Sequence, residues 1–323
     1  MKQKMRKFVL FLICGAMLCS CTKTSKQRQI VVTVMTSAHP YFQAVIAEWQ
    51  RLARQNDFQV SIMDPNFDNA RLMKIVEDLI TRRPDGVAFA PLDSRIAVKM
   101  LQKIVAAGIP VIAYNINPSE PVVPTVVGED LQGGQIAGEA AAHEWQANHP
   151  GKIPKIGIVG QVGIAEVDKR ETGFMEGVRR IYPEAILTQK VNGYGVRDKA
   201  LRAAEDMLQA HRDLDIAFGI NDDSALAIVD AVQEIGLQNL LIAGIGGSEP
   251  MVKEMLRPHS PLKIVVANPP KTIADSGWEL LQKVMQGDKR YQLHYLPFIK
   301  IEPDGAQEWL EEQFPSEKNA VKS

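Results

Sequence analysis

The chain has 323 residues, of which 46% are apolar and 23% are charged, an ordinary composition for a globular protein. Its formal net charge of −1 excludes a strongly basic chain of the kind that binds nucleic acid through its overall charge. The length is sufficient for one large domain or for two lobes of ordinary size.

The first 21 residues have the order of features found in a secretory signal. A basic stretch, residues 2–7, precedes an apolar run over 8–18, which is shorter than the ~20 apolar residues of a membrane-spanning helix. The following Leu18-Cys19-Ser20-Cys21 resembles the lipobox of bacterial lipoproteins. We therefore expect a lipoprotein signal peptide over 1–21, with cleavage before Cys21 and lipidation of its thiol. A plain secretory signal is the alternative. Polar residues 22–29 would form a tether.

All three cysteines, Cys14, Cys19 and Cys21, lie in this leader. The rest of the chain therefore offers no thiol for an intrachain disulfide, a zinc–cysteine site or a cysteine nucleophile. The leader also contains basic residues and no acidic one, so the chain that remains after cleavage is more acidic than the whole.

From residue 30 onward, short apolar runs rich in β-branched residues alternate with segments of helical periodicity. The runs predict strands over 30–35, 58–64, 86–91, 110–115, 155–161, 185–192, 215–221, 240–246 and 263–269. The periodic segments predict helices over 43–55, 69–83, 95–108, 131–146, 197–212, 222–236 and 271–287. Strands that alternate with helices form parallel sheets, and continuously apolar strands indicate helices on both faces. The predicted fold class is therefore α/β.

Three segments that contain proline interrupt this alternation, namely 117–134, 267–272 and 295–305. We interpret them as crossings between two lobes, near Gly128, Pro269 and Pro297. The prediction is two doubly wound parallel-sheet lobes joined by a three-crossing hinge. The expected parts are an N-terminal lobe over 30–128 plus 269–297, a C-terminal lobe over 129–268 plus 298–310, and a polar tail over 311–323.

Open α/β sheets bind ligands outside the carboxyl ends of their strands. The polar and aromatic residues that follow the predicted strands are Ser37, His39, Tyr41, Phe42, Asp64, Asn66, Asp93, Ser94, Asn115, Asn117, Glu166, Asp168, Asn192, Tyr194, Asn221, Asp222, Ser248 and Asn268. Asparagine, aspartate and aromatic residues dominate this set. Asp93 and Asp222 also suit the N-caps of the helices that follow them, and this alternative stays open.

Catalytic motifs are absent from the sequence. It contains no G-x-S-x-G elbow and no H-E-x-x-H spacing, and "IVGQVG" and "AGIGGSE" are incomplete as dinucleotide-binding loops. We therefore expect no enzyme activity, no metal and no cofactor. Asparagine and aspartate can instead bind the hydroxyl groups of a sugar, while an aromatic ring covers its apolar C–H face.

Several motifs together resemble the type I periplasmic sugar-binding proteins, most closely the ribose-binding group. The motifs are "SAHPYF", "AGIPVIAYN", "GEDLQGGQIAGE", "DKRETGFMEGV" and "AFGINDDSALA", and the resemblance covers about residues 30–302. Carried over position by position, it implies ligand contacts at His39, Tyr41, Phe42, Asn115, Asp168, Tyr194, Asn221 and Asn268. Phe42 and Tyr194 would be the stacking rings. The strand-end rule adds Asp93, Asn117 and Asp222 as candidates.

The chain also departs from the ribose-type pattern. Asn115-Ile116 replaces Asp-Arg, Asp168 replaces an arginine, Ile245-Gly246 replaces an aromatic-Asp pair, and Ala90 replaces an asparagine. Isoleucine cannot substitute for the forked hydrogen bonds of a guanidinium group. D-ribose in its usual pose is therefore not the expected ligand. We expect a neutral hydroxylated ligand. We expect Arg170 to brace its loop, and a contact of Arg170 with the ligand is the alternative.

The resemblance implies a monomeric, lipid-anchored periplasmic protein that captures a small sugar or polyol by lobe closure and delivers it to the membrane permease of an ABC importer. A sensor that presents the closed form to a histidine kinase or chemoreceptor is the alternative. A DNA-binding repressor with the same fold would need a helix-turn-helix where this chain has its leader. No nucleic-acid partner is expected.

The lipobox makes a prediction about anchoring. We expect the Cys21→Ser variant to leave the membrane fraction, because serine cannot receive the lipid, whereas Cys19→Ser should remain membrane-bound. Fractionation followed by immunoblotting measures both variants. Retention of Cys21→Ser in the membrane to the wild-type extent would contradict the lipobox.

Overall fold

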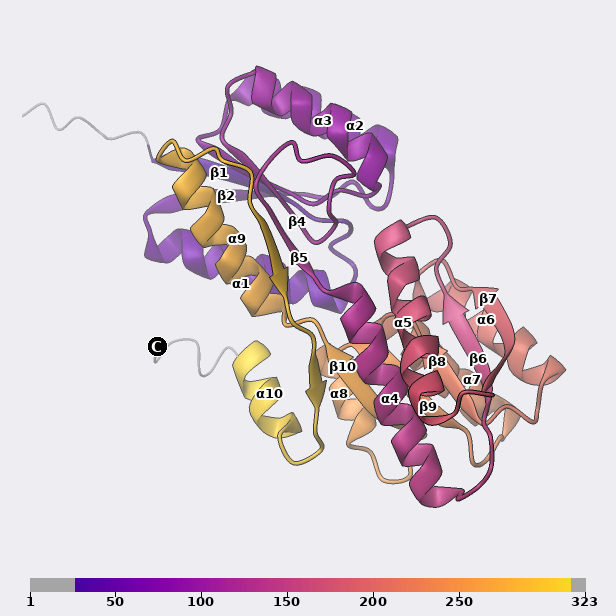
Figure 1. Cartoon of the computed structure of the whole chain (residues 1–323). Helices are drawn as coiled ribbons and strands as arrows, with labels where there is room; N and C mark the ends of the chain where they lie inside the picture. The colour runs from indigo at the N-terminus through magenta and orange to yellow at the C-terminus, as the bar shows by residue number, and fades with distance from the viewer. Residues whose placement is uncertain (1–26, 315–323) are drawn as a thin grey trace, which may run out of the picture.

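The computed structural model describes residues 27–314, so the predicted signal peptide and Cys21 lie outside the described residues. Two separate six-stranded sheets form the centres of two lobes (Figure 1). Among the described residues, no helix combines the length and apolarity that crossing a bilayer requires. The predicted fold class is confirmed.

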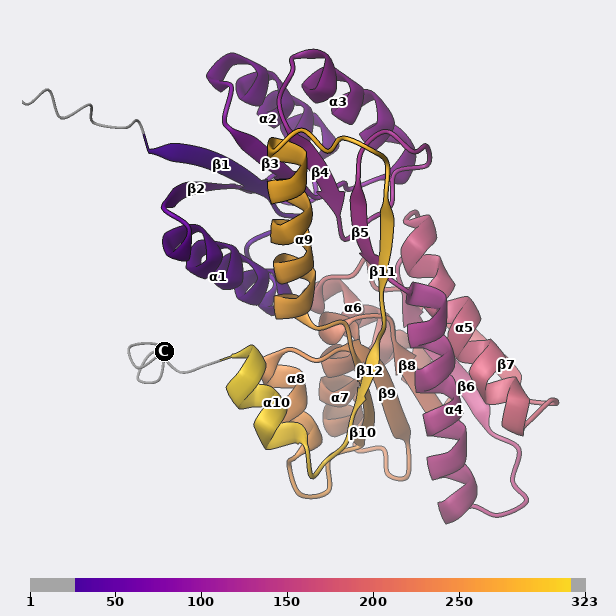
Figure 2. The ribbon, with the colours of Figure 1, turned by 60° about the vertical axis from the view of Figure 1, so that its left-hand side comes forward.

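The first lobe contains an all-parallel sheet with the strand order β11-β5-β4-β3-β1-β2. Its strands are β1 Arg28–Thr33, β2 Phe58–Met63, β3 Gly86–Phe89, β4 Val111–Tyr114, β5 Thr125–Gly128 and β11 Leu293–Leu296. Helices α1 Pro40–Gln55 and α9 Pro270–Met285 pack together on one face, and α2 Asn69–Arg82 and α3 Ser94–Ala106 pack on the other (Figure 2). Because helices cover both faces, β3 and β4 are buried along their whole length.

The second lobe contains a sheet with the order β12-β10-β9-β8-β6-β7, in which only β12 runs antiparallel to its neighbour. Its strands are β6 Lys155–Gly160, β7 Ile186–Asn192, β8 Ile216–Gly219, β9 Leu241–Gly246, β10 Leu262–Ala267 and β12 Ile299–Ile301. Its helices are α4 Asp130–Asn148, α5 Ala165–Ile181, α6 Arg197–Ala210, α7 Asp222–Ile235, α8 Glu249–Met255 and α10 Ala306–Gln313. The α4–α5 pair and the α6–α7 pair cover opposite faces, and each face has its own apolar core.

The chain passes between the sheets between β5 and α4, between β10 and α9, and between β11 and β12. The predicted lobe boundaries fall in these three short links. Phe298, in the last link, is buried, and its ring lies 2.6 Å from where a Cβ on Gly128 would be and 2.7 Å from one on Gly133. The last link therefore packs closely against the end of β5 and the first turn of α4.

Two predicted boundaries differ from the structure. Strand β1 begins at Arg28, so the last two residues of the predicted tether belong to the sheet, where β2 pairs with them. Helix α10 continues to Gln313, whose buried side chain accepts a hydrogen bond from the backbone N–H of Lys271 (3.3 Å). The predicted polar tail therefore starts too early, because Trp309 and Leu310 dock this helix on the second lobe.

Helices α4 and α5 touch backbone to backbone through four glycines. A Cβ on Gly134 or Gly138 would lie 2.2 or 2.0 Å from a backbone oxygen of α5, and one on Gly173 or Gly177 would lie 2.2 or 2.3 Å from a backbone oxygen of α4. Real Cβ atoms do not approach carbonyl oxygens so closely, so glycine is required at these positions. The spacing of four residues places each pair of glycines on one face of its helix.

This contact predicts that Gly138→Ala lowers the free energy of unfolding by at least ~2 kcal/mol, because the added methyl group forces two packed backbones apart. Gly277→Ala in α9 is the matched control, since its Cβ would meet side chains and no backbone, with Trp49 at 3.0 Å and Ile112 at 3.6 Å. Alanine gains about 1 kcal/mol of helix propensity over glycine, so we expect a small net change there. Chemical denaturation measures both variants. Equal losses would contradict the backbone contact.

Candidate functional site

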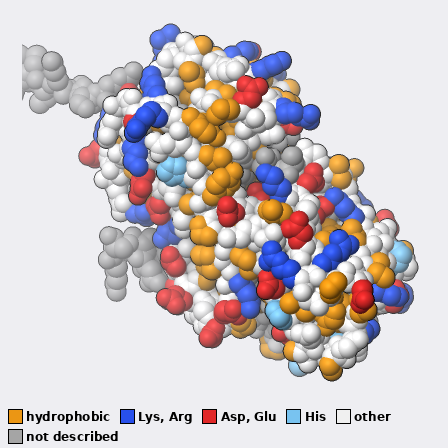
Figure 3. Space-filling view, viewed as in Figure 1, with side chains coloured by type: hydrophobic (Ala, Val, Ile, Leu, Met, Phe, Trp, Pro, Cys, Tyr) orange, Lys and Arg blue, Asp and Glu red, His pale blue; other side chains and the backbone are white. Residues whose placement is uncertain are grey.

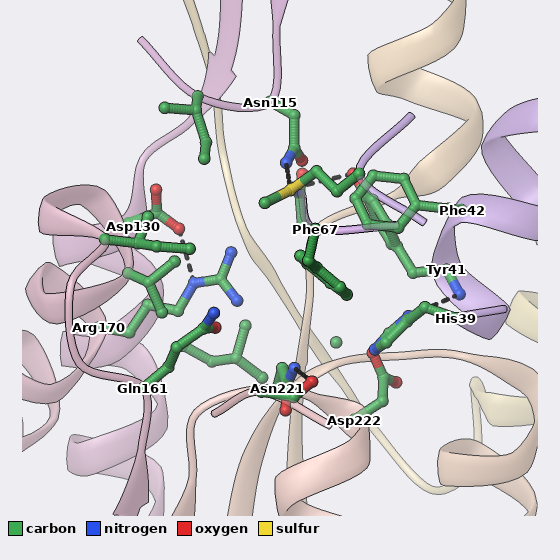
Figure 4. Close-up of a pocket in the computed structure, with 18 residues that line it drawn as sticks. His39, Tyr41, Phe42, Phe67, Asn115, Asp130, Gln161, Arg170, Asn221 and Asp222 are labelled. Carbon is green, nitrogen blue, oxygen red and sulfur yellow. Dashed lines mark hydrogen bonds and ion pairs between the residues drawn. The ribbon is translucent and has the colours of Figure 1, made fainter. Parts of the chain in front are cut away.

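A cavity of about 80 Å³ lies between the lobes, and residues of both lobes line it (Figure 4). Most of them follow the carboxyl ends of strands: Met35 after β1, Phe67 after β2, Asn115 after β4, Gln161 after β6, Asn221 after β8 and Asn268 after β10. This is the position at which parallel α/β sheets bind ligands.

The first turn of α1 forms one wall of the cavity. His39 caps this helix by accepting a hydrogen bond at Nδ1 from the backbone N–H of Tyr41 (3.2 Å), and Pro40 fits the first helical position. Tyr41 and Phe42 are both buried and meet edge to face, with ring centroids 5.1 Å apart. Both residues line the cavity.

The Tyr41 hydroxyl has a free donor in this wall. It accepts a hydrogen bond from Asn268 Nδ2 (3.2 Å), so its own proton remains available. Burial raises the pKa of Tyr41 above the ordinary range, which keeps the hydroxyl protonated. The other amide atom, Asn268 Oδ1, is buried and has no hydrogen-bond partner within residues 27–314. A donor and an acceptor thus stand together at the cavity.

The opposite wall contains the ion pair of Arg170 and Asp130. Arg170 Nε lies 2.7 Å from Asp130 Oδ1, and its Nη1 donates to the backbone carbonyl of Ile220 (3.2 Å). Its Nη2 has no hydrogen-bonding protein partner in the described part of the chain. The guanidinium group points into the cavity in Figure 4. Arg170 therefore braces the site, as expected, and also lines it.

The floor of the cavity is formed by the start of α7. Asn221 is the N-cap: its Oδ1 accepts from the Ser224 N–H (2.9 Å), and its Nδ2 donates to the Gly195 carbonyl (2.9 Å). Asp222 is 2% exposed, and its Oδ1 accepts from the Ser248 N–H (2.7 Å). A Cβ on Gly246 would lie 2.1 Å from Asp222 Oδ2, so the missing side chain makes room for this carboxylate.

Charges of both lobes act on Asp223, which lies beside this floor. Burial raises the pKa of Asp223, His39 of the other lobe lowers it, and the neighbouring Asp222 adds to the rise. Because residues of both lobes line the same cavity, the described conformation is one in which the lobes meet around it.

The structure brings together seven of the residues predicted for the site: His39, Tyr41, Phe42, Asn115, Asn221, Asp222 and Asn268. The backbone of Asn115 is left-handed (φ 72°), and its Nδ2 contacts Met35 Sδ at 3.2 Å. Because a thioether is a weak acceptor, this amide retains capacity for a further partner.

The other four predicted residues, Asp93, Asn117, Asp168 and Tyr194, lie outside the cavity. Asp93 is the N-cap of α3, as its alternative interpretation proposed. Asn117 lies at a separate depression beside Glu129 and Tyr295. Asp168 precedes Arg170 by two residues on α5, and residues so spaced point in different directions, so Arg170 lines the cavity instead.

Tyr194 is 55% exposed on the rim, where Lys199 lies 4.5 Å above its ring. The backbone N–H of Tyr194 donates a hydrogen bond to Asn192 Oδ1 (3.0 Å), and the backbone of Tyr194 is left-handed (φ 57°). This turn directs the ring to an outer groove that Asp93 also lines. The structure thus differs from the prediction that Tyr194 stacks inside the cavity.

Several lining residues were missed by sequence reasoning, namely Met35, Phe67, Asp130, Gln161, Ile164, Val167 and Gly195. Gln161 follows β6 directly, so the strand-end rule could have found it. Asp130 becomes a candidate only once its partner Arg170 is placed in the site. No sequence signal that we know marks Phe67.

Two α/β lobes that enclose a cavity at the carboxyl ends of their strands define a solute-binding protein that surrounds its ligand. The chain belongs to the periplasmic binding protein family, because the profile of the periplasmic binding protein domain matches residues 30–289. The predicted resemblance to the type I periplasmic sugar-binding proteins is thereby confirmed.

Curated relatives match over most of their length. The ribose import binding protein of Bacillus subtilis is 26% identical over 267 residues, which cover 82% of this chain and 84% of the relative. The ABC transporter periplasmic-binding protein YphF of Escherichia coli is 24% identical over 323 residues, which cover 96% of this chain and 98% of the relative.

Solved structures share the fold. An ABC transporter solute-binding protein from Actinobacillus succinogenes with bound D-allose has a TM-score of 0.79 at 20% identity, covering 87% of this chain and 99% of its own. One from Bacillus halodurans with bound myo-inositol has a TM-score of 0.79 at 20% identity, covering 91% and 100%.

The floor geometry predicts that Gly246→Ala destabilises the protein. The new methyl group would displace the Asp222 carboxylate from the Ser248 N–H, and a buried polar group left unpaired costs about 1–3 kcal/mol. Gly163→Ala is the matched control, since Gly163 also has a positive φ (102°) but has open space around its Cβ position. Denaturant unfolding compares the variants. A loss in Gly246→Ala no larger than in Gly163→Ala would contradict the packing role of Asp222.

Proposed function

We propose that this protein captures a small, neutral, hydroxylated solute, a sugar or polyol, between its lobes and presents the closed form to the permease of an ABC importer. The observation that carries the proposal is the set of unused hydrogen-bonding atoms at the cavity: the Tyr41 hydroxyl, Asn268 Oδ1, Asp222 Oδ2 and Arg170 Nη2. They combine donors with acceptors, as neighbouring hydroxyl groups require.

The charges at the cavity favour a neutral ligand. Arg170 is already paired with Asp130, and Asp222 adds a buried carboxylate, so the lining carries an excess of negative charge. An anionic ligand would have to bury its charge beside Asp222, which is costly without a partner. A neutral sugar can instead donate to Asp222 and accept from Arg170. An amine-bearing ligand is the second choice.

Lobe closure supplies the mechanism. The cavity has walls from both lobes, so a ligand completes its contacts only when the lobes meet. Binding therefore shifts the population toward the closed form. The family and the names of the relatives support a role in import from the periplasm. The visible face of the molecule carries interspersed positive and negative side chains (Figure 3), which suits a protein that does not bind nucleic acid. We further propose that a lipid on Cys21 anchors the protein.

A thermal-shift screen of the mature protein tests this function. A ligand at 100 times its Kd should add about 2.7 kcal/mol to the free energy of unfolding, and we expect hits among pentoses, hexoses and polyols rather than nucleosides. Calorimetry should then compare the best sugar with its sugar acid and its phosphate. We expect each anion to bind at least tenfold more weakly, which corresponds to about 1.4 kcal/mol.

The variant Asp222→Asn serves as the control for charge. This variant removes the buried negative charge, so the difference in Kd between the neutral sugar and its sugar acid should be smaller than in the wild type. Tighter binding of the acid or the phosphate to the wild type would contradict the neutral-ligand proposal. A screen without any sugar or polyol hit would contradict the proposed function as a whole.

A further inference from the structure

Phe67 has an unusual backbone for a bulky residue. It lies in the loop between β2 and α2, and its φ is 56°, while the preceding Asn66 has a φ of 51°. Asparagine tolerates the left-handed region, whereas a large side chain without a local hydrogen-bonding group is a genuine outlier there. Such conformations persist where the surroundings enforce them, and they concentrate at ligand sites.

The surroundings of this loop do enforce the conformation. Asp64 accepts hydrogen bonds from the backbone N–H groups of Ser37 (2.8 Å) and Asn66 (2.6 Å) and from the Ser37 hydroxyl. The Phe67 N–H donates to the Met35 carbonyl (2.9 Å), and Asp68 caps α2. Although burial opposes the shift, these hydrogen bonds hold the pKa of Asp64 below its usual value. The loop is therefore fixed to the segment that follows β1 on one side and to α2 on the other.

This fixed backbone aims the Phe67 ring at the cavity. Phe67 lines the cavity and also the outer groove that contains Asp93 and Tyr194, as do Gln161 and Ile164, so the ring forms part of the partition between the two spaces. Figure 4 shows it pointing into the cavity, apart from the Tyr41–Phe42 pair. At 37% exposure the side chain is not a core residue. The Phe67 ring is thus held in place although its backbone conformation is strained, and it remains partly exposed. Such a ring is suited to pack against a bound ligand.

We infer that Phe67 is a specificity-determining residue that covers the apolar C–H face of a cyclic solute, so that the site takes ring-shaped sugars or cyclitols in preference to open-chain polyols. This inference rests on the proposed function and narrows it. A ring-shaped sugar offers a flat C–H face to an aromatic side chain, whereas an open-chain alditol has no fixed face to offer.

The test uses matched pairs of ring and open-chain solutes with the same number of carbons: D-ribose with ribitol, D-allose with allitol, and myo-inositol with sorbitol. Calorimetry measures their Kd values with the wild type and with Phe67→Gly, Phe67→Ala and Phe67→Tyr. We expect the wild type to prefer the ring form of its best pair by at least tenfold. Phe67→Gly and Phe67→Ala should both lose that preference, and Phe67→Tyr should keep affinity within threefold.

Thermal unfolding without ligand adds a readout of the strained backbone. Both small variants lack the ring, but only glycine relieves the left-handed conformation, so Phe67→Gly should unfold at a higher temperature than Phe67→Ala. His259 provides the matched control, since it is exposed, has a φ of 61° and lies away from the cavity. His259→Gly should unfold above His259→Ala, with unchanged Kd values in both.

The outcomes separate this inference from the proposed function. An affinity of Phe67→Gly within threefold of the wild type, equal binding of ring and open-chain solutes by the wild type, or a greater loss in Tyr194→Gly than in Phe67→Gly would overturn the role of Phe67 and leave the solute-binding function standing. Failure of the wild type to bind any of the six solutes, together with a screen that gives no sugar or polyol hit, would overturn the proposed function and this inference with it.

Discussion

The close contact of α4 with α5 is the constraint on which the site depends. Four glycines allow the two backbones to touch, and the same contact brings the first residue of α4 beside the second turn of α5. Asp130 and Arg170 occupy these positions, so their ion pair is a consequence of the packing. Larger residues in place of the glycines would separate the helices and leave a guanidinium group without its partner at the edge of the cavity.

A further glycine, Gly246, makes room for a second charged group of the cavity, the Asp222 carboxylate, on the other side of the second lobe. At the end of β9, the absence of a side chain on Gly246 leaves the volume that the Asp222 carboxylate occupies. The ribose-type pattern has an aspartate at the position of Gly246, whereas this chain has no side chain there. The position of the Asp222 carboxylate at the start of α7 therefore depends on the space that Gly246 leaves.

The sequence was sufficient for the fold class, and seven of the residues that it proposed for the site line the cavity. The alternation of apolar runs with helical periodicity indicated both sheets, and the strand-end rule found Asn115, Asp222 and Asn268. Sequence patterns failed for the strands and side chains whose positions depend on contacts between residues that are distant in the sequence. Strands β5, β11 and β12 lie in segments that prolines mark as crossings, and only pairing with neighbouring strands makes them part of the sheets. Tyr194 was misplaced, and Phe67 missed, because left-handed turns set the direction of both rings.

The ring of Phe298 connects the mechanics of the lobes to the electrostatics of the site. It fills the space beside Gly128 at the end of β5 and Gly133 in α4, and the guanidinium carbon of Arg170 lies 5.6 Å from its centroid. The chain crosses between the lobes at three links, so a rotation of one lobe against the other would turn about these links and move the residues packed on Phe298. Because the Arg170 guanidinium group lies over the same ring, such a rotation would also change the position of this positive charge relative to the solvent.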